Sequence, residues 1–317
     1  MIHHKTIGVV VPAYNEELLI SDTLKNIPSF VDQIIVVNDA SRDKTKEKIL
    51  KIKNHDKRIL LINNKSNKGL GATLAVGYLK GLDLGLDCIG VMAGDNQMDP
   101  KDLKNICLPV VEEKVDYTKG NRLLVKDVSK VMPKHRFIGN IIATFLTKFA
   151  TGYWPLIDPQ SGYTAISKKA LAKIDIGTLK KGYGYNADIL SRLNIYNFKI
   201  TDIEIKPVYG KETSGIKFFH YTLDVTYFLT KIFLKRLKEK YLIRDFHPLV
   251  IFYFLSFVNI IIVAIPLAIR FFVLYFRYHQ APTTTLTILV FALMMGFFSF
   301  GFAIWLDMES NKDLFVK

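Results

Sequence analysis

The chain has 317 residues, of which half are hydrophobic, and a formal net charge of +14 at pH 7. Its length suits one large domain with an extension, or two domains. The basic excess could indicate nucleic-acid binding, but no nucleic-acid motif is present and the excess gathers beside C-terminal apolar segments, so we expect no nucleic-acid partner.

The start of the chain and its cysteines favour a domain in a reducing cytoplasm. The first apolar run, Ile7–Val11, is too short for a secretory signal, so none is expected. The two cysteines, Cys88 and Cys107, are too few for a disulfide framework.

Short apolar runs alternate with helix-like segments through the first two thirds of the chain. Because the runs are continuous rather than alternating, they predict a mostly parallel sheet covered on both faces. Ligands of such sheets bind at the carboxyl ends of the strands. The expected strands are 6–11, 33–38, 58–63, 88–93 and 116–121, with helices near 16–27, 43–53, 70–80 and 99–113.

A polar motif follows each of the first four expected strands, which predicts a binding site there. The motifs are PAYNEE, NDASRDKT, NKSNKGLGAT and GDNQMDP. Gly69 and Gly71 could receive a phosphate on backbone amides at a helix start. The dinucleotide and Walker patterns are both incomplete, however.

Several acidic residues of these motifs have two interpretations. Asp39 suits a ribose hydroxyl or a base edge, whereas Ser41 or Asp43 suits a helix N-cap. Glu16 belongs either to the site or to a helix N-terminus, which acids favour.

The stretch VMAGDNQMDP, residues 91–100, combines a metal-site pattern with a helix start. Asp95 and Gln97 could hold a divalent cation together with substrate phosphates. Asp99 precedes Pro100 and is interpreted as an N-cap in preference to a metal ligand.

Two C-terminal segments, 248–269 and 283–306, carry no charge. A bilayer core about 30 Å thick needs roughly 20 apolar helical residues, so both are predicted to span a membrane; the alternative is a pair of buried core helices. Basic residues before the first segment place the large domain in the cytoplasm. They are Lys231, Lys235, Arg236, Lys238, Lys240 and Arg244.

The segment before the first span has an apolar stripe with lysines on the opposite face. This pattern favours a helix at the membrane interface, and the alternative is a surface helix packed on the globular domain. The stripe is Val225, Leu229, Phe233, Leu237 and Tyr241, widened by Phe228 and Ile232.

The order of the motifs resembles that of family 2 glycosyltransferases with the type A fold. VVVPAYNEE, VVNDASRDKT, NKGLGATLAVG, GDNQMDPKDL, KGNR, DPQSGY and GYGYNADIL carry the resemblance over residues 5–217. The chain is most similar to dolichyl-phosphate mannose synthases and polyprenyl-phosphate glucosyltransferases. This resemblance implies a nucleotide-sugar pocket of Pro12, Tyr14, Glu16, Asp39, Lys68, Gly69, Asp95 and Gln97.

The resemblance also implies a Mg²⁺ or Mn²⁺ ion at Asp95 and Gln97. The family usually has Asp-x-Asp at this motif, and Ala93 replaces the first Asp here. The ion would act as a Lewis acid on the leaving diphosphate.

Acceptor residues come from the later motifs. By resemblance, Arg122 and Arg136 would hold a lipid phosphate. Arginine suits this role because it binds phosphate through two parallel hydrogen bonds. The alternative for each arginine is a surface salt bridge. Asp158 is a further candidate beside the sugar. The remaining acceptor candidates are Asn140, Gln160, Ser214 and Lys217.

Asp188 is a candidate general base, as in inverting members of the family. A phosphate acceptor is already an anion, so an orienting role or a helix-start role is the alternative.

The sequence as a whole predicts an inverting transferase that moves a hexose from a UDP- or GDP-sugar to polyprenyl or dolichyl phosphate. The expected parts are a cytoplasmic domain (1–217), a juxtamembrane amphipathic helix (218–246) and a hairpin with two spans in the bilayer (247–317). The alternatives are transfer to a sugar hydroxyl of a lipid-linked glycan, a non-catalytic nucleotide-sugar-binding membrane protein, and a nicotinamide oxidoreductase. Homo-oligomerisation stays open.

Overall fold

The computed structural model describes residues 1–124, 134–182, 184–206 and 218–317, with the helical backbone alone at 134–140 and 218–223. The chain forms two compact units, Met1–Arg236 with Asp313–Lys317, and Leu237–Lys312. The first unit continues to Arg236 and also takes the last five residues. The expected division at residues 217 and 246 stays a prediction.

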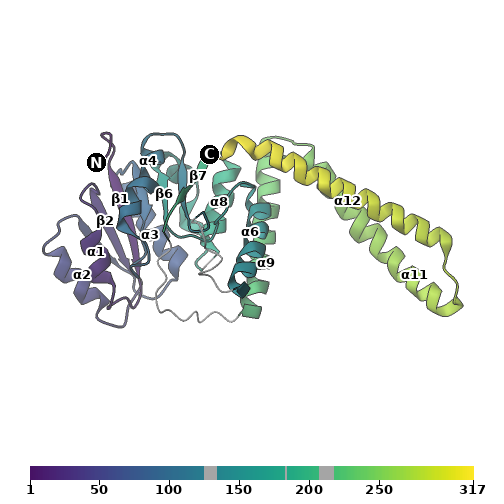
Figure 1. The fold of residues 1–317 in the computed structure, drawn as a ribbon, viewed down its shortest axis with the longest axis horizontal. Coiled ribbons are helices and arrows are strands. Elements are labelled where there is room, and N and C mark those ends of the chain that lie inside the picture. Colours follow the sequence, from purple (N-terminus) through teal and green to yellow (C-terminus); the bar gives the residue numbers. More distant parts are fainter. Residues whose placement is uncertain (125–133, 183, 207–217) are drawn as a thin grey trace. The chain divides into compact units, whose positions relative to one another are not determined.

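Among the described residues, one sheet of seven strands forms the first unit (Figure 1). The strand order is β3-β2-β1-β4-β6-β5-β7, and β6 alone runs antiparallel to its neighbours. This confirms the predicted mostly parallel sheet. The strands are β1 (Ile7–Ala13), β2 (Gln33–Asn38), β3 (Ile59–Asn63), β4 (Cys88–Val91), β5 (Tyr117–Asn121), β6 (Thr164–Ser167) and β7 (Ile200–Glu204).

Side chains of the central strands alternate between two hydrophobic cores. Val10 faces the core beneath α3 (Leu70–Asp83) and α8 (Tyr185–Ile195), whereas Val9 and Val11 face the core beneath α1 (Ile20–Asn26) and α4 (Leu103–Val111). Burial on both faces explains why these strands are continuous apolar runs. Both cysteines are buried, and in the described structure both are free thiols.

The remaining helices of the first unit connect or flank the strands. They are α2 (Thr45–Lys53), the 3₁₀ turn η1 (Pro100–Asp102), α6 (Lys134–Thr151), α7 (Lys168–Lys173), η2 (Ile176–Thr178) and α9 (Phe218–Arg236).

The apolar stripe of α9 packs against protein. Leu229 and Ile232 are buried in one cluster with Ala150 of α6 and Ala187 of α8, and the rings of Phe149 and Phe233 stack at 4.6 Å. The membrane-interface interpretation of this stripe is therefore wrong, and the packed-helix alternative holds. A stripe at helical spacing requires an apolar partner, and here α6 and α8 supply it.

Arg236 joins the end of α9 to the end of α6. Its side chain is fully buried and donates to the carbonyl oxygens of Phe149 and Ala150, at 3.1 Å each. Gly152 follows with φ of +80°, the left-handed conformation common just after a helix. The guanidinium satisfies terminal carbonyls and meets the negative end of the α6 dipole.

The last residues of the chain extend the sheet edge. Phe315 lies beside Ile200 of β7 as a parallel bridge, and Val316 donates its N–H to the Ile200 carbonyl at 2.9 Å. The Thr201 hydroxyl donates to the Val316 carbonyl at 2.6 Å. Both ends of the segment 237–312 are therefore continuous with the first unit.

Two helices of the described chain are long and apolar enough to cross a membrane, Leu249–Tyr278 and Thr283–Leu314. Both belong to the second unit apart from the last two residues of the second helix. The first runs through α10 (Leu249–Phe257), a π-helical segment η4 (Val258–Ala264) and α11 (Ile265–Tyr278). In the most apolar 18-residue stretch of each helix, at most 22% is buried. This exposure contradicts the alternative that the two helices form a buried core.

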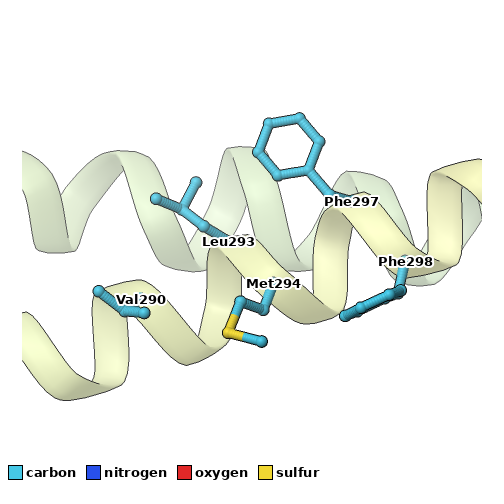
Figure 2. A pocket seen from close by; sticks show the side chains of 5 residues that line it. All are labelled: Val290, Leu293, Met294, Phe297 and Phe298. Atoms are coloured by element: carbon cyan, nitrogen blue, oxygen red, sulfur yellow. The ribbon is translucent and has the colours of Figure 1, made fainter.

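The second helix, α12 (Thr283–Asn311), presents a shallow apolar groove (Figure 2). The helix continues into the short turn η5 (Lys312–Leu314). Uninterrupted apolar surface of this kind suits hydrocarbon better than water. The groove is lined by Val290, Leu293, Met294, Phe297 and Phe298.

A buried polar cluster joins the first and last helical segments of the second unit. The π-helical segment η3 (Leu237–Arg244) supplies Lys240 and Tyr241, and α12 supplies Asp307 and Asn311. Lys240 donates to Asn311 Oδ1 at 2.7 Å, and the Tyr241 hydroxyl donates to Asp307 Oδ1 at 2.8 Å. These bonds satisfy polar groups that would otherwise be costly to bury.

Candidate active site

The loops after β1 and β2 are tied to each other. The Asn15 N–H donates to Ser41 Oγ at 3.1 Å, and the Arg42 N–H donates to Asn15 Oδ1 at 2.9 Å. Asn15 has φ of +57°, which asparagine tolerates better than most residues. The Glu16 N–H donates to Thr45 Oγ1 at 2.8 Å. The PAYNEE and NDASRDKT motifs therefore form one surface.

The N-cap residue of α2 is Lys44, so Asp43, one of the two expected caps, lies one residue before the cap and supports the start of the helix from there. It accepts from the Thr45 N–H at 3.0 Å and from the Glu17 N–H at 3.1 Å. Burial opposes its ionisation, but these hydrogen bonds and that of the Thr45 hydroxyl hold the pKa of Asp43 below its usual value. Ser41 instead bonds Asn15, so its role is to join the two loops.

Asp39 lies buried at the end of β2 and organises the next motif. Its carboxylate accepts from Asn64 Nδ2 at 2.7 Å and from the N–H groups of Lys68 and Gly69, each at 2.9 Å. The side chain of Lys68 itself is exposed. A nucleotide that uses Asp39 would meet a carboxylate already fixed by the NKSNKG loop.

The glycines of NKGLGA are explained by close backbone packing. A Cβ on Gly69 would lie 2.7 Å from the Lys181 carbonyl oxygen, and one on Gly71 would clash with that of Lys180. The Gly71 N–H donates to the Lys181 carbonyl at 2.9 Å. With the amides of Lys68 and Gly69 donated to Asp39, the phosphate-cradle interpretation of these glycines is wrong.

The end of β1 adjoins the end of β4. Pro12 is buried, and its carbonyl accepts from the Gly94 N–H at 3.2 Å. Tyr14 is 41% exposed, so its ring is accessible to a ligand, and Glu16 is half-buried. Pro12 of the first motif thus borders the 93–99 loop.

That loop is a tight turn with a separate helix cap. Asp95 Oδ1 accepts from the Gln97 N–H at 3.1 Å, and Asn96 has φ of +58°. Asp99 Oδ1 accepts from the Lys101 N–H at 2.9 Å, with Pro100 as the first residue of η1. The N-cap prediction for Asp99 is confirmed, and its carboxylate serves the helix.

The donor set at this loop fits a cation that arrives with phosphates. Among the described residues, no three His, Cys, Asp or Glu side chains are grouped as a metal site. Asp95 and Gln97 remain as oxygen donors of the half-buried loop. Mg²⁺ is commonly held by one or two carboxylates with substrate phosphates and waters, so a single carboxylate is sufficient in kind.

Arg122 and Asp158 form a bidentate ion pair. Arg122 follows β5, and its Nε and Nη2 donate to the two carboxylate oxygens at 2.8 and 3.1 Å. The Asp158 side chain is 4% exposed and that of Arg122 is 36% exposed. Burial works against the charge of Asp158, but Arg122, with Lys119, holds the pKa of Asp158 below its usual range.

Lys119 was not predicted, although a lysine inside a buried strand is a sequence signal. Its side chain is fully buried, and its ammonium donates to the Ser161 carbonyl and, at 3.1 Å, to Asn186 Oδ1. Asn186 Nδ2 donates to the Gln160 carbonyl at 3.2 Å. These bonds join KGNR, DPQSGY and GYGYNADIL, so Gln160 is held at the same place as the other acceptor motifs.

Asp202 of β7 was also missed. It accepts from Asn121 Nδ2 at 2.8 Å and from the Ile157 N–H at 3.0 Å. Its Oδ1 has no hydrogen-bond partner in the described structure. Burial raises the pKa of Asp202 to about 6, against the hydrogen bonds that favour its charge.

Asp188 lies in a buried ion pair within α8. Its two oxygens accept from Arg192 Nε and Nη2 at 2.9 and 3.0 Å, and one also accepts from the Lys180 N–H at 2.9 Å. Arg192 donates in turn to the carbonyls of Asp175 and Thr178. The carboxylate therefore fixes the loop that packs on the Gly69–Gly71 turn.

Four acceptor candidates lie outside the described side chains. Arg136 and Asn140 are on the first part of α6, where the backbone alone is described, and Ser214 and Lys217 lie in the range 207–217.

Solved structures define the fold. Glucosyl-3-phosphoglycerate synthase from Mycobacterium tuberculosis, in complex with Mn²⁺, UDP and glucosyl-3-phosphoglycerate, matches 74% of this chain and 80% of its own with a TM-score of 0.53 and 17% identity. This likeness establishes the type A glycosyltransferase fold.

The chain belongs to glycosyl transferase family 2, whose model matches residues 8–175. An uncharacterized protein of Methanocaldococcus jannaschii is 35% identical over 66% of this chain and 84% of its own. UDP-N-acetylglucosamine–dolichyl-phosphate N-acetylglucosaminyltransferase of Methanococcus voltae is 29% identical over 65% of this chain and 86% of its own. Polyprenol monophosphomannose synthase of Mycolicibacterium smegmatis is 26% identical over 62% and 75%. The protein is therefore a glycosyltransferase related to dolichyl- and polyprenyl-phosphate sugar transferases.

Proposed function

We propose that this glycosyltransferase moves a hexose from a UDP- or GDP-sugar to polyprenyl or dolichyl phosphate at the cytoplasmic face of a membrane. The proposal assigns one substrate to each half of the site at the carboxyl ends of the parallel strands. The nucleotide sugar binds at the loops of β1, β2 and β4 (the donor half), and the lipid phosphate binds at the loops of β5 and β6 (the acceptor half).

The observation that carries the proposal is the order of the strands. The loops after β2, β1 and β4 hold Asp39, Tyr14 and Asp95, whereas β6 and β5 hold the DPQSGY loop and Arg122. The two groups adjoin at the β4–β6 pair, where the Tyr163 hydroxyl donates to the Asp99 carbonyl at 2.9 Å. Acidic and aromatic residues on one side suit a nucleotide, and the arginine on the other suits an acceptor phosphate.

The reaction follows from these assignments. An oxygen of the acceptor phosphate forms a bond to the anomeric carbon, and the bond from that carbon to the nucleotide diphosphate breaks with its electron pair leaving on the diphosphate. Attack opposite the leaving group inverts the anomeric centre. Arg122 would hold the acceptor phosphate in line, which lowers the entropic part of the barrier.

Asp95 and Gln97 would hold a Mg²⁺ or Mn²⁺ ion together with the diphosphate. When bound, such an ion supplies positive charge to the departing diphosphate. Asp95 accepts the Gln97 N–H, and this bond keeps its carboxylate oriented within the turn.

Asp188 has a supporting role in this proposal. Its carboxylate is engaged by Arg192 and the Lys180 N–H, and a phosphate acceptor needs no base to remove a proton. Transfer to a sugar hydroxyl would require Asp188 to leave this buried pair.

Membrane attachment is proposed from the second unit. Two helices that each cross a membrane once return the chain to the side on which it started. Both ends of the segment 237–312 join the first unit, which fits two such crossings. Lys231, Lys235 and Lys238 are exposed, which supports a cytoplasmic position beside anionic headgroups.

The test is sugar transfer by the full chain in membranes. A panel of labelled UDP- and GDP-sugars is offered with polyprenyl phosphate, with and without Mg²⁺ or Mn²⁺, and with Asp95→Ala as the matched variant. We expect an organic-soluble, mild-acid-labile product that depends on the metal and on Asp95. Binding of a nucleotide sugar without transfer to lipid phosphate would overturn the proposal.

A further inference from the structure

Lys119 occupies a central position beneath the acceptor half of the site. Its ammonium connects the Ser161 carbonyl and Asn186 Oδ1, and Asn186 in turn holds the Gln160 carbonyl. Both acceptors of the ammonium are neutral oxygens. Burying a cation in this way is costly unless nearby anions compensate.

The compensating anions come from two other elements. Asp202 lies opposite Lys119 in the register of β5 and β7, and Asp158 belongs to the DPQSGY loop. Both acids favour the charged lysine, whereas Arg122 opposes it. On β6, the residue in register with Lys119 is the neutral Thr164. Burial outweighs the two acids and lowers the pKa of Lys119 to about 7.

The arrangement leaves Asp158 dependent on two cations. In the described structure its charged hydrogen-bond partner is the Arg122 guanidinium, through two hydrogen bonds. The backbone N–H groups of Arg122 and Gln160 also donate to the Asp158 carboxylate, at 3.3 Å each, but they carry no net charge. An acceptor phosphate competes for the same guanidinium fork, because a carboxylate and a phosphate make the same bidentate contact. When Arg122 turns to the phosphate, Asp158 becomes a buried carboxylate that needs another positive charge.

We propose that Lys119 is a positioning residue for acceptor binding, because its buried ammonium supplies the charge that stabilises Asp158 when Arg122 turns to the acceptor phosphate. This inference rests on the proposed function, in which Arg122 binds that phosphate. Lys119 itself does not touch the substrate; it acts through Asp158 and through the Ser161 and Asn186 contacts that hold the loop.

A pH dependence follows from the position of Lys119. Below about pH 7 its amine is charged and Arg122 exchanges readily. Above that pH the neutral amine no longer compensates Asp158, so Arg122 stays on Asp158 and the acceptor binds more weakly. The KM for polyprenyl phosphate should therefore rise with pH, and kcat should change less.

The experiment compares full-chain variants in membranes between pH 6 and pH 9. Lys119→Met removes the buried charge, and Lys104→Met removes an exposed charge from the same unit as a control. We expect the KM of the unmodified chain to rise about tenfold across this range, the change that one pKa unit of coupling represents. Lys119→Met should show a high KM at all pH values, and Lys104→Met should follow the unmodified chain. Comparison at equal pH cancels the ionisation of the acceptor itself.

A second variant keeps the test decisive if Lys119→Met does not fold. Asn186→Asp preserves an oxygen for the ammonium and adds a negative charge beside it, which should raise the pKa of Lys119. The rise in KM should then move to higher pH by about one unit. A pH profile of KM that neither Lys119→Met nor Asn186→Asp alters would overturn the positioning role.

Thermal unfolding separates this inference from the proposed function. A buried lysine that loses its proton near pH 7 binds fewer protons in the folded chain than in the unfolded chain, so the Tm should rise with pH above 7 relative to Lys119→Met. If this Tm difference is present but no sugar is transferred to lipid phosphate, the proposed function is wrong. The titration of buried Lys119 near pH 7 is then still confirmed. If sugar is transferred and Lys119→Met leaves KM unchanged, the inference fails alone.

Discussion

The Arg122 guanidinium binds the Asp158 carboxylate through two hydrogen bonds of 2.8 and 3.1 Å, with Asp158 almost fully buried and Arg122 more than a third exposed. The exposed partner is therefore the one that a ligand can reach. This asymmetry makes the pair more than a surface salt bridge, because the buried acid holds the arginine at the carboxyl end of β5.

Arg122→Lys should separate charge from geometry. Lysine keeps the positive charge but loses the fork that binds a carboxylate or a phosphate through two hydrogen bonds. We expect kcat/KM for the lipid phosphate to fall roughly 10- to 100-fold, the equivalent of one hydrogen bond to a charged group. Steady-state kinetics with polyprenyl phosphate measures this, and Arg42→Lys, at an exposed arginine of the same unit, serves as the control. Unchanged kinetics in Arg122→Lys would contradict an acceptor role.

Ala93 allows a test of the metal site by gain of function. Ala93→Asp adds the carboxylate that the family pattern usually has, two residues before Asp95 and in the same half-buried loop. Because more carboxylates bind Mg²⁺ or Mn²⁺ more tightly, the metal concentration for half-maximal transfer should fall by about tenfold. A metal titration of transfer activity measures the effect. No change in that concentration would place the cation elsewhere.

Removing the Asp99 carboxylate from the same loop is the control for the Ala93→Asp variant. Asp99→Ala removes the cap of η1 and should cost about 1 kcal/mol of folding free energy while the metal titration stays as in the unmodified chain. Unfolding by denaturant measures the first quantity. A shifted metal titration in Asp99→Ala would make Asp99 a ligand in spite of its cap.

Asp188→Asn should reduce stability more than chemistry. The substitution leaves Arg192 buried without its charge partner, and breaking such a pair costs about 3–5 kcal/mol. We expect a lower Tm, with kcat per folded molecule retained within about tenfold, a factor equal to 1.4 kcal/mol of barrier. If the Tm is unchanged and kcat is abolished, Asp188 is a base and the acceptor is a hydroxyl.

The parallel strands β1 to β4 could be predicted from the sequence, whereas β6 and β7, on the acceptor side of the sheet, could not. Continuous apolar runs identified β1, β2 and β4 because those strands are buried on both faces, and a similar run identified β3 although most of that strand is half-buried. β6 is a four-residue antiparallel strand, and β7 reads ITDIE with polar residues at three of its five positions, so neither has an apolar run to detect. Both strands, with Lys119 and Asp202, complete the acceptor half.

The candidate site shows a similar limit. Sequence position placed Asp39, Asp95 and Arg122 at strand ends, as the structure has them, but it does not reveal partners that come from distant segments. Asp39 is bound by amides about thirty residues away, and Asp158 is likewise distant from Arg122. The Asp188–Arg192 pair could have been predicted from the sequence, because the two residues are four apart on one helix. The stripe of α9 was misassigned because an apolar face has the same spacing whether lipid or protein covers it.

Asp202 makes stability depend on pH in a specific direction. Its pKa is raised to about 6 in the folded chain, so between about pH 4 and pH 6 the folded chain binds more protons than the unfolded chain. The stabilising contribution of protonated Asp202 is therefore complete at low pH and is lost as pH rises through about 6. Asp202→Asn imitates the protonated acid and should stabilise the chain at pH 7.5 by roughly 1–3 kcal/mol.

The same variant should give no gain at pH 4, where Asp202 is already protonated. Thermal unfolding of the full chain at the two pH values measures the difference, with Asp22→Asn at an exposed helix position as the control that shifts little at either pH. An equal gain at pH 4 and pH 7.5 would mean that the amide improves packing without any titration. A loss at pH 7.5 would mean that the ionised form of Asp202 is the one the fold requires, paired electrostatically with Lys119.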